Sequence, residues 1–137
     1  MSRILAIDYG AKRTGIAVTD PLGIIAQPLE TVATAELMAF LKKYTSTESV
    51  ECIVVGLPRQ MDGSESENMA RIKPFVGRLR KELPQIPVEY YDERFTSVLA
   101  QRTMIDGGVR KMDRRDKGMV DRISAAIILQ GYMESKK

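Results

Sequence analysis

The segment that most constrains this chain is residues 4–20, ILAIDYGAKRTGIAVTD, because it holds two apolar runs joined by a short turn. The first run is apolar throughout, which is typical of a central strand, and it ends on the carboxylate of Asp8. The second run alternates apolar and polar residues, as a half-buried strand does. Gly10 provides the conformational freedom that a tight turn needs. The segment therefore predicts two neighbouring strands, with a carboxylate where the first one ends.

The rest of the chain predicts a third strand and then alternating helices and strands. Residues 24–32 can form the third strand, and Pro28 indicates an edge or a bulge. Three strands so close in sequence favour an antiparallel arrangement, and the later units add parallel strands, which gives a mixed sheet covered by helices. Such sheets bind ligands at the carboxyl ends of their strands. Further strands are expected at 50–58 and 86–91, and helices at 34–44, at 64–83 (with a capping box at Ser64 and Glu67, and a bend at Pro74), at 97–105 and at 117–134.

Size and composition fit a single domain over residues 1–137. The chain has 137 residues, of which 44% are hydrophobic, and this is enough to form one buried core. No apolar run approaches the roughly 20 residues that cross a bilayer, so we expect a cytoplasmic protein with no membrane partner. The single cysteine, Cys52, lies in an apolar run, which indicates a buried side chain rather than a reactive thiol.

The lack of histidine narrows the possible chemistry. The chain contains no His, which excludes a Ser-His-Asp triad and most zinc sites. If the protein is an enzyme, carboxylates, lysines, hydroxyl groups or a metal ion must carry out its reaction.

Three acidic residues occupy positions from which their side chains could meet. Asp8 ends the first strand, Glu93 follows the last strand, and Asp121 lies in the final helix beside an apolar stripe. The small residues 124–126 would let that helix approach the sheet closely. Like charges at short range repel unless a cation lies between them, and oxygen ligands suit Mg²⁺ or Mn²⁺. This pattern predicts two-metal hydrolysis of phosphodiesters, with Asp8 bridging the ions and Glu93 and Asp121 completing either side.

Each acidic residue also has an ordinary structural explanation. Asp8 could accept hydrogen bonds from the backbone amides of its own turn, and Glu93 could form a surface ion pair with an arginine. Asp121 could pair with Arg122 or Lys117 on a solvated helix face. Spacing along the chain leaves these alternatives open.

Basic residues near these positions indicate a phosphate-bearing partner. The net charge is only +3, but residues 109–122, VRKMDRRDKGMVDR, are dense in cations, which attract nucleic-acid backbones. A solvated loop is the alternative explanation, whereas a substrate-binding loop would close over the nucleic acid. The candidate nucleic-acid-binding residues are Lys12, Arg13, Arg59, Arg94, Arg110, Lys111, Arg114 and Arg115.

Four stretches, taken together and in this order, resemble the YqgF family of RNase H-like proteins. They cover almost the whole chain, from the first strand to the final helix, and any one alone would be a weak signal. The family is described as nucleases that resemble Holliday junction resolvases or that process 16S rRNA precursors. The stretches are AIDYGAKRTGIAVTD, VVGLPRQMDGSES, YYDERFTS and DRISAAIILQGYM.

This resemblance implies a fold and an activity. The fold would be α/β and RNase H-like, a five-stranded mixed sheet with strands one to three antiparallel, flanked by helices. The metal-binding acids of the family match Asp8, Glu93 and Asp121, which would hold Mg²⁺ or Mn²⁺. The implied function is 5′ processing of pre-16S rRNA in ribosome biogenesis, with cleavage of branched DNA as the alternative.

Two other classes of function remain as alternatives. The opening stretch is also similar to the first phosphate loop of actin-like ATPases, although such an enzyme needs two lobes and this chain supplies one. A non-catalytic RNA-binding module could use the basic stretch at 109–117 without metal. The sequence does not distinguish a monomer from a homodimer, and a junction resolvase would have to act as a symmetric pair.

Overall fold

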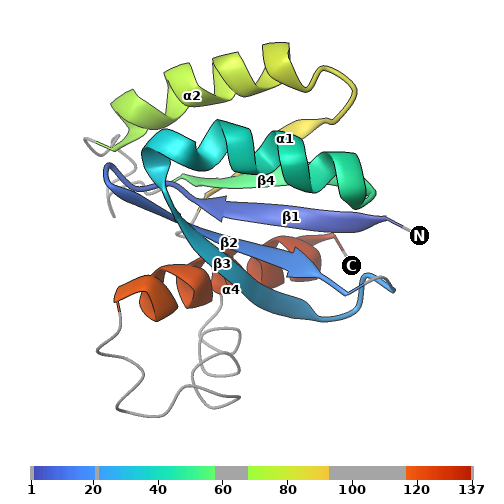
Figure 1. Cartoon of the computed structure of the whole chain (residues 1–137). Coiled ribbons are helices and arrows are strands. Elements are labelled where there is room, and N and C mark those ends of the chain that lie inside the picture. The colour runs from blue at the N-terminus through green and yellow to red at the C-terminus, as the bar shows by residue number, and fades with distance from the viewer. Residues whose placement is uncertain (1, 21, 58–67, 93–116, 137) are drawn as a thin grey trace.

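The computed structural model describes residues 2–20, 22–57, 68–92 and 117–136 (Figure 1). Strands and helices alternate as the sequence predicts after the first three strands. The elements are β1 (Arg3–Asp8), β2 (Arg13–Thr19), β3 (Ala26–Ala33), the 3-10 helix η1 (Thr34–Glu36), α1 (Leu37–Thr47), β4 (Val50–Leu57), α2 (Met69–Glu82), β5 (Val88–Asp92) and α4 (Lys117–Ser135).

The strands form one five-stranded sheet in the order β3-β2-β1-β4-β5. β2 pairs antiparallel with β1 and β3, while β4 pairs parallel with β1 and β5, so the predicted mixed sheet is confirmed. β3 is an edge strand. Its register against β2 shifts between Ile16, which pairs with Glu30, and Ala17, which pairs with Pro28. The sequence predicts an edge or a bulge from Pro28, and β3 has both an edge position and an irregular register.

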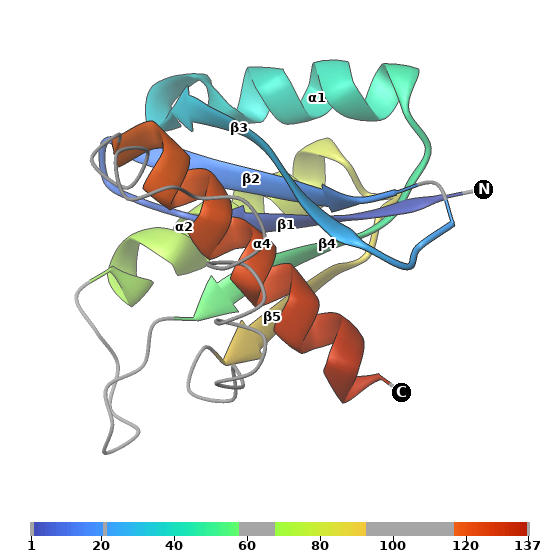
Figure 2. The ribbon, with the colours of Figure 1, turned by 90° about the horizontal axis from the view of Figure 1, so that it is seen from below.

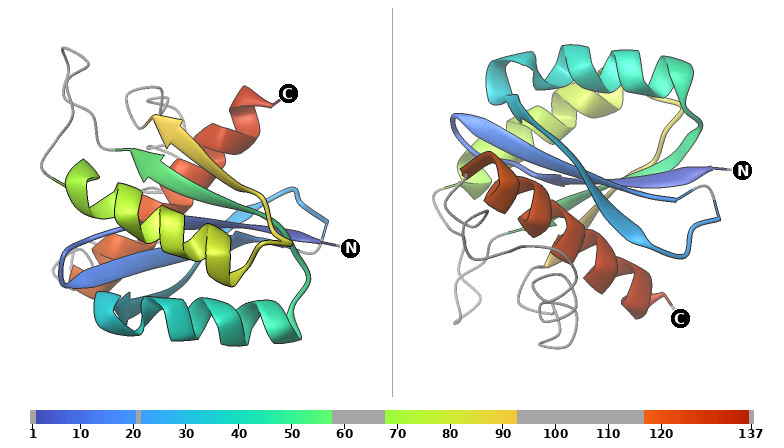
Figure 3. Two further views of the ribbon diagram at one scale, coloured as in Figure 1. Left: turned by 90° about the horizontal axis from the view of Figure 1, so that it is seen from above. Right: turned by 60° about the horizontal axis from the view of Figure 1, so that its bottom comes forward.

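Helices cover both faces of the sheet. α1 and α2 lie over one face and α4 crosses the other, as Figure 2 and Figure 3 show. Each face has its own hydrophobic cluster, one shared with α1 and α2 and one shared with α4. α4 packs mainly on β2, β3 and β1, which places its first turns near the turn between β1 and β2.

The side chains of the two central strands differ in size between the faces. Because successive residues of a strand point to opposite sides, Leu5 and Ile7 enter the α1/α2 cluster while Ala6 faces α4. In β2, Ile16 likewise enters the α1/α2 cluster, while Ala17 faces α4. Small side chains therefore line the central strands under α4, and they let that helix approach the sheet closely.

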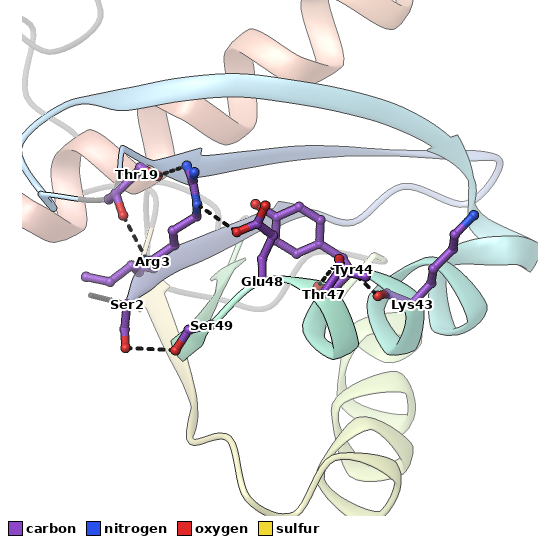
Figure 4. A network of polar contacts seen from close by, with 9 residues as sticks. Ser2, Arg3, Thr19, Lys43, Tyr44, Thr47, Glu48 and Ser49 are labelled. Carbon is purple, nitrogen blue, oxygen red and sulfur yellow. Dashed lines mark hydrogen bonds and ion pairs between the residues drawn. The ribbon is translucent and has the colours of Figure 1, made fainter.

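Polar contacts fix the amino end of β1 (Figure 4). Arg3 Nη1 donates to the Thr19 carbonyl at 3.0 Å, and the Ile4 amide donates to the Thr19 hydroxyl at 2.9 Å. The Arg3 Nε also lies 3.7 Å from a carboxylate oxygen of Glu48, just after α1. A slip of one residue would turn every side chain of a strand to the other face, so these contacts help hold the register that orients Asp8.

Some predicted elements are shifted or lie outside the described ranges. The third strand begins at Ala26 rather than at residue 24, and α2 begins at Met69 and continues through Pro74. The proposed capping box at 64–67 and the helix predicted at 97–105 are not among the described residues. Among the helices that the structure does describe, none has the length and hydropathy needed to span a bilayer.

Cys52 is buried, as its apolar surroundings predict. Its thiol lies 3.2 Å from Glu89 Oε2, and the same oxygen accepts a 2.5 Å hydrogen bond from the Tyr132 hydroxyl of α4. Burial, together with the Glu89 carboxylate, raises the pKa of the thiol to about 12. Cys52 is therefore a protonated packing residue that helps fasten α4 to the sheet.

Candidate active site

Asp8 is the last residue of β1, the central strand, and it faces α4. The register between β1 and β2 pairs Asp8 with Gly15. Ala6 is packed against α4, so the alternation along the strand directs Asp8 to the same side. Asp8 thus lies at the carboxyl end of the middle strand, opposite a residue that has no side chain.

Gly15 is where α4 comes closest to the sheet. A Cβ atom placed on Gly15 would overlap the main-chain carbonyl of Asp121 and would lie 3.0 Å from the Arg122 nitrogen. The buried Ala125 and Ala126 lie one turn further along the helix. The absence of a side chain at residue 15 therefore brings the backbone of Asp121 directly over the strand position beside Asp8.

The two carboxylates are close enough to interact electrostatically. The pKa of Asp8 is raised from 3.8 to about 6, mainly by burial and to a smaller extent by the negative charge of Asp121. Repulsion between carboxylates disfavours the ionised form of Asp8, and desolvation acts in the same direction. Residues 8 and 121, which are 113 positions apart in the sequence, therefore lie close enough in the structure to interact.

Arg13 binds Asp121. Its Nε lies 2.6 Å from Asp121 Oδ2 and joins the start of β2 to α4. The sequence predicted Arg13 as a phosphate-binding residue and considered Arg122 or Lys117 as partners of Asp121. The structure places Arg13 on this carboxylate, an arrangement that the sequence reasoning missed because no local spacing relates the two residues.

Hydroxyl groups hold the turn that follows Asp8. Thr34 donates to the Gly10 carbonyl at 2.6 Å, and its hydroxyl lies 2.9 Å from that of the fully buried Thr14. The Gly10 amide points to the Thr14 hydroxyl at 3.5 Å rather than to Asp8. Residues other than Asp8 therefore hold the turn. These contacts give no support to the alternative that Asp8 serves to accept hydrogen bonds from the backbone amides of this turn.

A side chain from the start of α2, on the opposite face of the sheet from α4, also contacts this turn. Asn68, at the start of α2, donates through Nδ2 to the Tyr9 carbonyl at 2.6 Å. Thr34 and Asn68 therefore hold the turn, and sequence reasoning did not find either residue. The turn signal around Gly10 was visible, but their long-range partners were not.

The remaining predicted site residues are placed only in part. β1, β4 and β5 are parallel, so Asp8, Leu57 and Asp92 end their strands at one edge of the sheet. Glu93 follows Asp92 in the sequence but is outside the described residues. Lys12 is exposed in the turn beside Arg13. Also outside the described residues are Arg59, Arg94, Arg110, Lys111, Arg114 and Arg115.

The donor set suits a hard divalent cation. Within the described ranges no group of three potential ligands is found, but Asp8 and Asp121 form a pair of like-charged carboxylates. A cation between them would replace their repulsion with attraction, and Mg²⁺ and Mn²⁺ prefer oxygen ligands. The chemistry of these residues is therefore compatible with a metal site.

Comparisons of sequence identify the relatives of this chain. Residues 2–135 match the family model RuvX, described as Holliday junction resolvase. A protein from Phocaeicola vulgatus is 64% identical over 137 residues, which span all of this chain and 99% of that protein. One from Porphyromonas gingivalis is 57% identical over 98% of both chains. Both are named "Putative pre-16S rRNA nuclease".

Solved structures support the fold independently. RuvC from Thermus thermophilus superposes with a TM-score of 0.53, covering 98% of this chain and 96% of that one. RuvC of T. thermophilus in complex with a Holliday junction gives 0.60, with coverage of 100% and 98%. Identity is 15% in both cases, so the likeness concerns the fold, and the predicted RNase H-like architecture is confirmed. On the match across residues 2–135 and the near full-length relatives, this chain belongs to the RuvX (YqgF) family, as its four motifs predict.

Proposed function

We propose that this protein is a metal-dependent nuclease that cleaves the 16S rRNA precursor, and that Asp8, Asp121 and Glu93 form its metal site. Family membership supports the predicted enzyme class, a hydrolase acting on phosphodiester bonds. The observation that carries the site is the convergence of Asp8 and Asp121 at the carboxyl end of the central strand. This is the edge at which sheets of parallel strands bind ligands.

Glu93 is the third ligand in this proposal because of where β5 ends. Neighbouring strands are about 4.8 Å apart, so the ends of β1 and β5, separated by β4, are about 10 Å apart. Residue 93 follows the last residue of β5 directly. This separation of the strand ends is the ground on which the proposal assigns Glu93 to a cation, or a pair of cations, shared with Asp8.

The protein's own residues have distinct tasks in this reaction. Asp8, Asp121 and Glu93 would hold Mg²⁺ or Mn²⁺, which when bound activates water and stabilises charge on phosphate oxygens. Deprotonated Asp8 is the form that binds a cation, and its raised pKa of about 6 leaves that form dominant above neutral pH. Lys12, which is exposed in the turn, would contact a flanking phosphate.

The choice of RNA rests on the relatives. Proteins that are 57% and 64% identical over nearly their full length are named as putative pre-16S rRNA nucleases. Branched DNA is the second candidate, because the family model is described as that of a Holliday junction resolvase. A resolvase cuts two opposed strands and acts as a symmetric pair, so the oligomeric state in solution bears on this choice.

Asp8→Asn tests the metal mechanism. Loss of a ligand should lower the cleavage rate by at least about 100-fold, because the charge of the metal acts directly on the transition state. Wild type and variant should be assayed with Mn²⁺ on a 16S precursor fragment and on a four-way DNA junction. Equal rates for the two proteins would contradict the proposed site, and cleavage of the junction alone would contradict the proposed substrate.

A further inference from the structure

The ion pair between Arg13 and Asp121 joins a cation to a proposed metal ligand. Arg13 Nε lies 2.6 Å from Asp121 Oδ2, and the side chains of the two residues are 43% and 22% exposed. An ion pair with this exposure is weak and exchanges readily, because water competes for both partners. The contact is therefore one that a stronger ligand can replace.

The guanidinium and a divalent ion would compete for this carboxylate. Asp121 Oδ2 accepts a hydrogen bond from Arg13 Nε, at the end of α4 that lies against β2 beside Asp8. A metal ion bound by Asp8 and Asp121 would place a second positive charge next to the guanidinium. Repulsion between the two cations would then favour release of Arg13.

We propose that Arg13 is an exchangeable countercation, which occupies Asp121 until a divalent ion binds and is then released toward a substrate phosphate. This inference rests on the proposed metal site. Arg13 is the first residue of β2, next to the exposed turn that carries Lys12, so a released guanidinium has solvent and substrate within reach. Guanidinium groups bind phosphate oxygens with charge-assisted hydrogen bonds.

A different role for Arg13 makes the opposite prediction. If Arg13 served only to orient Asp121 for the metal, its loss would weaken metal binding. If it competes with the metal, its loss strengthens metal binding. The sign of the change in Mn²⁺ affinity therefore separates a competing residue from an orienting one.

The experiment compares Arg13→Gln with Lys12→Gln in the full-length protein, without nucleic acid. Both variants lose one positive charge at adjacent positions, and Arg13 is the one whose guanidinium lies 2.6 Å from Asp121 Oδ2. Mn²⁺ affinity measured by titration calorimetry should be about two- to fivefold tighter for Arg13→Gln than for Lys12→Gln, which corresponds to the strength of an exposed pair. Equal affinities, or weaker binding by Arg13→Gln, would overturn the inference.

A second variant and an independent assay keep the outcomes distinct. Arg13→Met keeps the aliphatic stem and has no hydrogen-bonding group, so it should show the same tightening; failure to do so would also overturn the inference. Mn²⁺ binding is measured without cleavage. A wild-type protein that binds Mn²⁺ but cuts neither substrate refutes the proposed function alone, whereas active wild type with unchanged Mn²⁺ affinity in the Arg13 variants refutes this inference alone.

Discussion

Replacing Gly15 with alanine should destabilise the protein by about 3 kcal/mol and abolish cleavage. The added methyl group would overlap the Asp121 carbonyl, which belongs to a helix backbone and cannot rotate away. α4 would have to move off the sheet and carry with it the carboxylate that faces Asp8. Urea unfolding measures the stability, and Mn²⁺ titration of the folded protein measures whether the paired carboxylates still bind a cation.

Gly77→Ala is the matched control for this substitution. Gly77 lies inside α2, and a Cβ atom there meets nothing within 4 Å. Alanine favours the helix over glycine by up to about 1 kcal/mol, so this variant should be slightly more stable than wild type and should bind Mn²⁺ normally. If Gly15→Ala matched Gly77→Ala in both measurements, the close approach of α4 would not be what assembles the site.

Gly15 illustrates how much of this site the sequence could reveal. The alternating run at 14–20 predicts the second strand, and the small residues 124–126 predict a close helix, but neither shows which strand residue the helix meets. That depends on the register between β1 and β2 and on how α4 crosses the sheet, and both are set by tertiary packing. The fold was therefore readable from local patterns, whereas the point of closest contact was not.

Asp8 and Arg13 also differ in how far the local sequence reveals their roles. Asp8 was identifiable because a carboxylate that ends a wholly apolar strand is unusual in itself. Arg13 has nothing unusual in its neighbourhood, and its partner is 108 residues away in the sequence. Electrostatic partners at such a separation become visible only when the fold brings the elements together.

In the absence of divalent ions, Asp8→Asn should make the protein more stable at neutral pH. The folded-state pKa of Asp8, about 6, is above the ordinary value of 3.8, so the folded protein favours the protonated group. Below pH 3.8 the group is protonated in both states and costs nothing. As the pH rises through 6 the folded protein must accept a charged carboxylate, and the shift of about two units corresponds to about 3 kcal/mol of lost stability.

Asparagine does not ionise, so this cost should be missing from the variant. The stability gain of Asp8→Asn, measured by urea unfolding with EDTA present, should be near zero at pH 3.5 and reach up to about 3 kcal/mol at pH 7.5. Asp20→Asn is the opposite control. The backbone amide of Ile25, and to a smaller extent that of Ile24, donates to Asp20 and lowers its pKa, so that variant should be less stable at pH 7.5 and approach wild type as the pH falls.

Mn²⁺ should close or reverse the stability gap between wild type and Asp8→Asn. Binding to the folded state alone stabilises a protein by RT ln(1 + [L]/Kd), about 2.7 kcal/mol when the ion is present at 100 times Kd. Wild type should gain this and the variant should not, so the gap seen at pH 7.5 in EDTA should close or change sign. A gap that stays constant across pH and Mn²⁺ concentration would mean that neither burial nor the charge of Asp121 raises the pKa of the Asp8 carboxylate, and that this carboxylate binds no cation. A gap that depends on both would show that one carboxylate, Asp8, is the source both of the stability lost at neutral pH and of the Mn²⁺ binding that restores it.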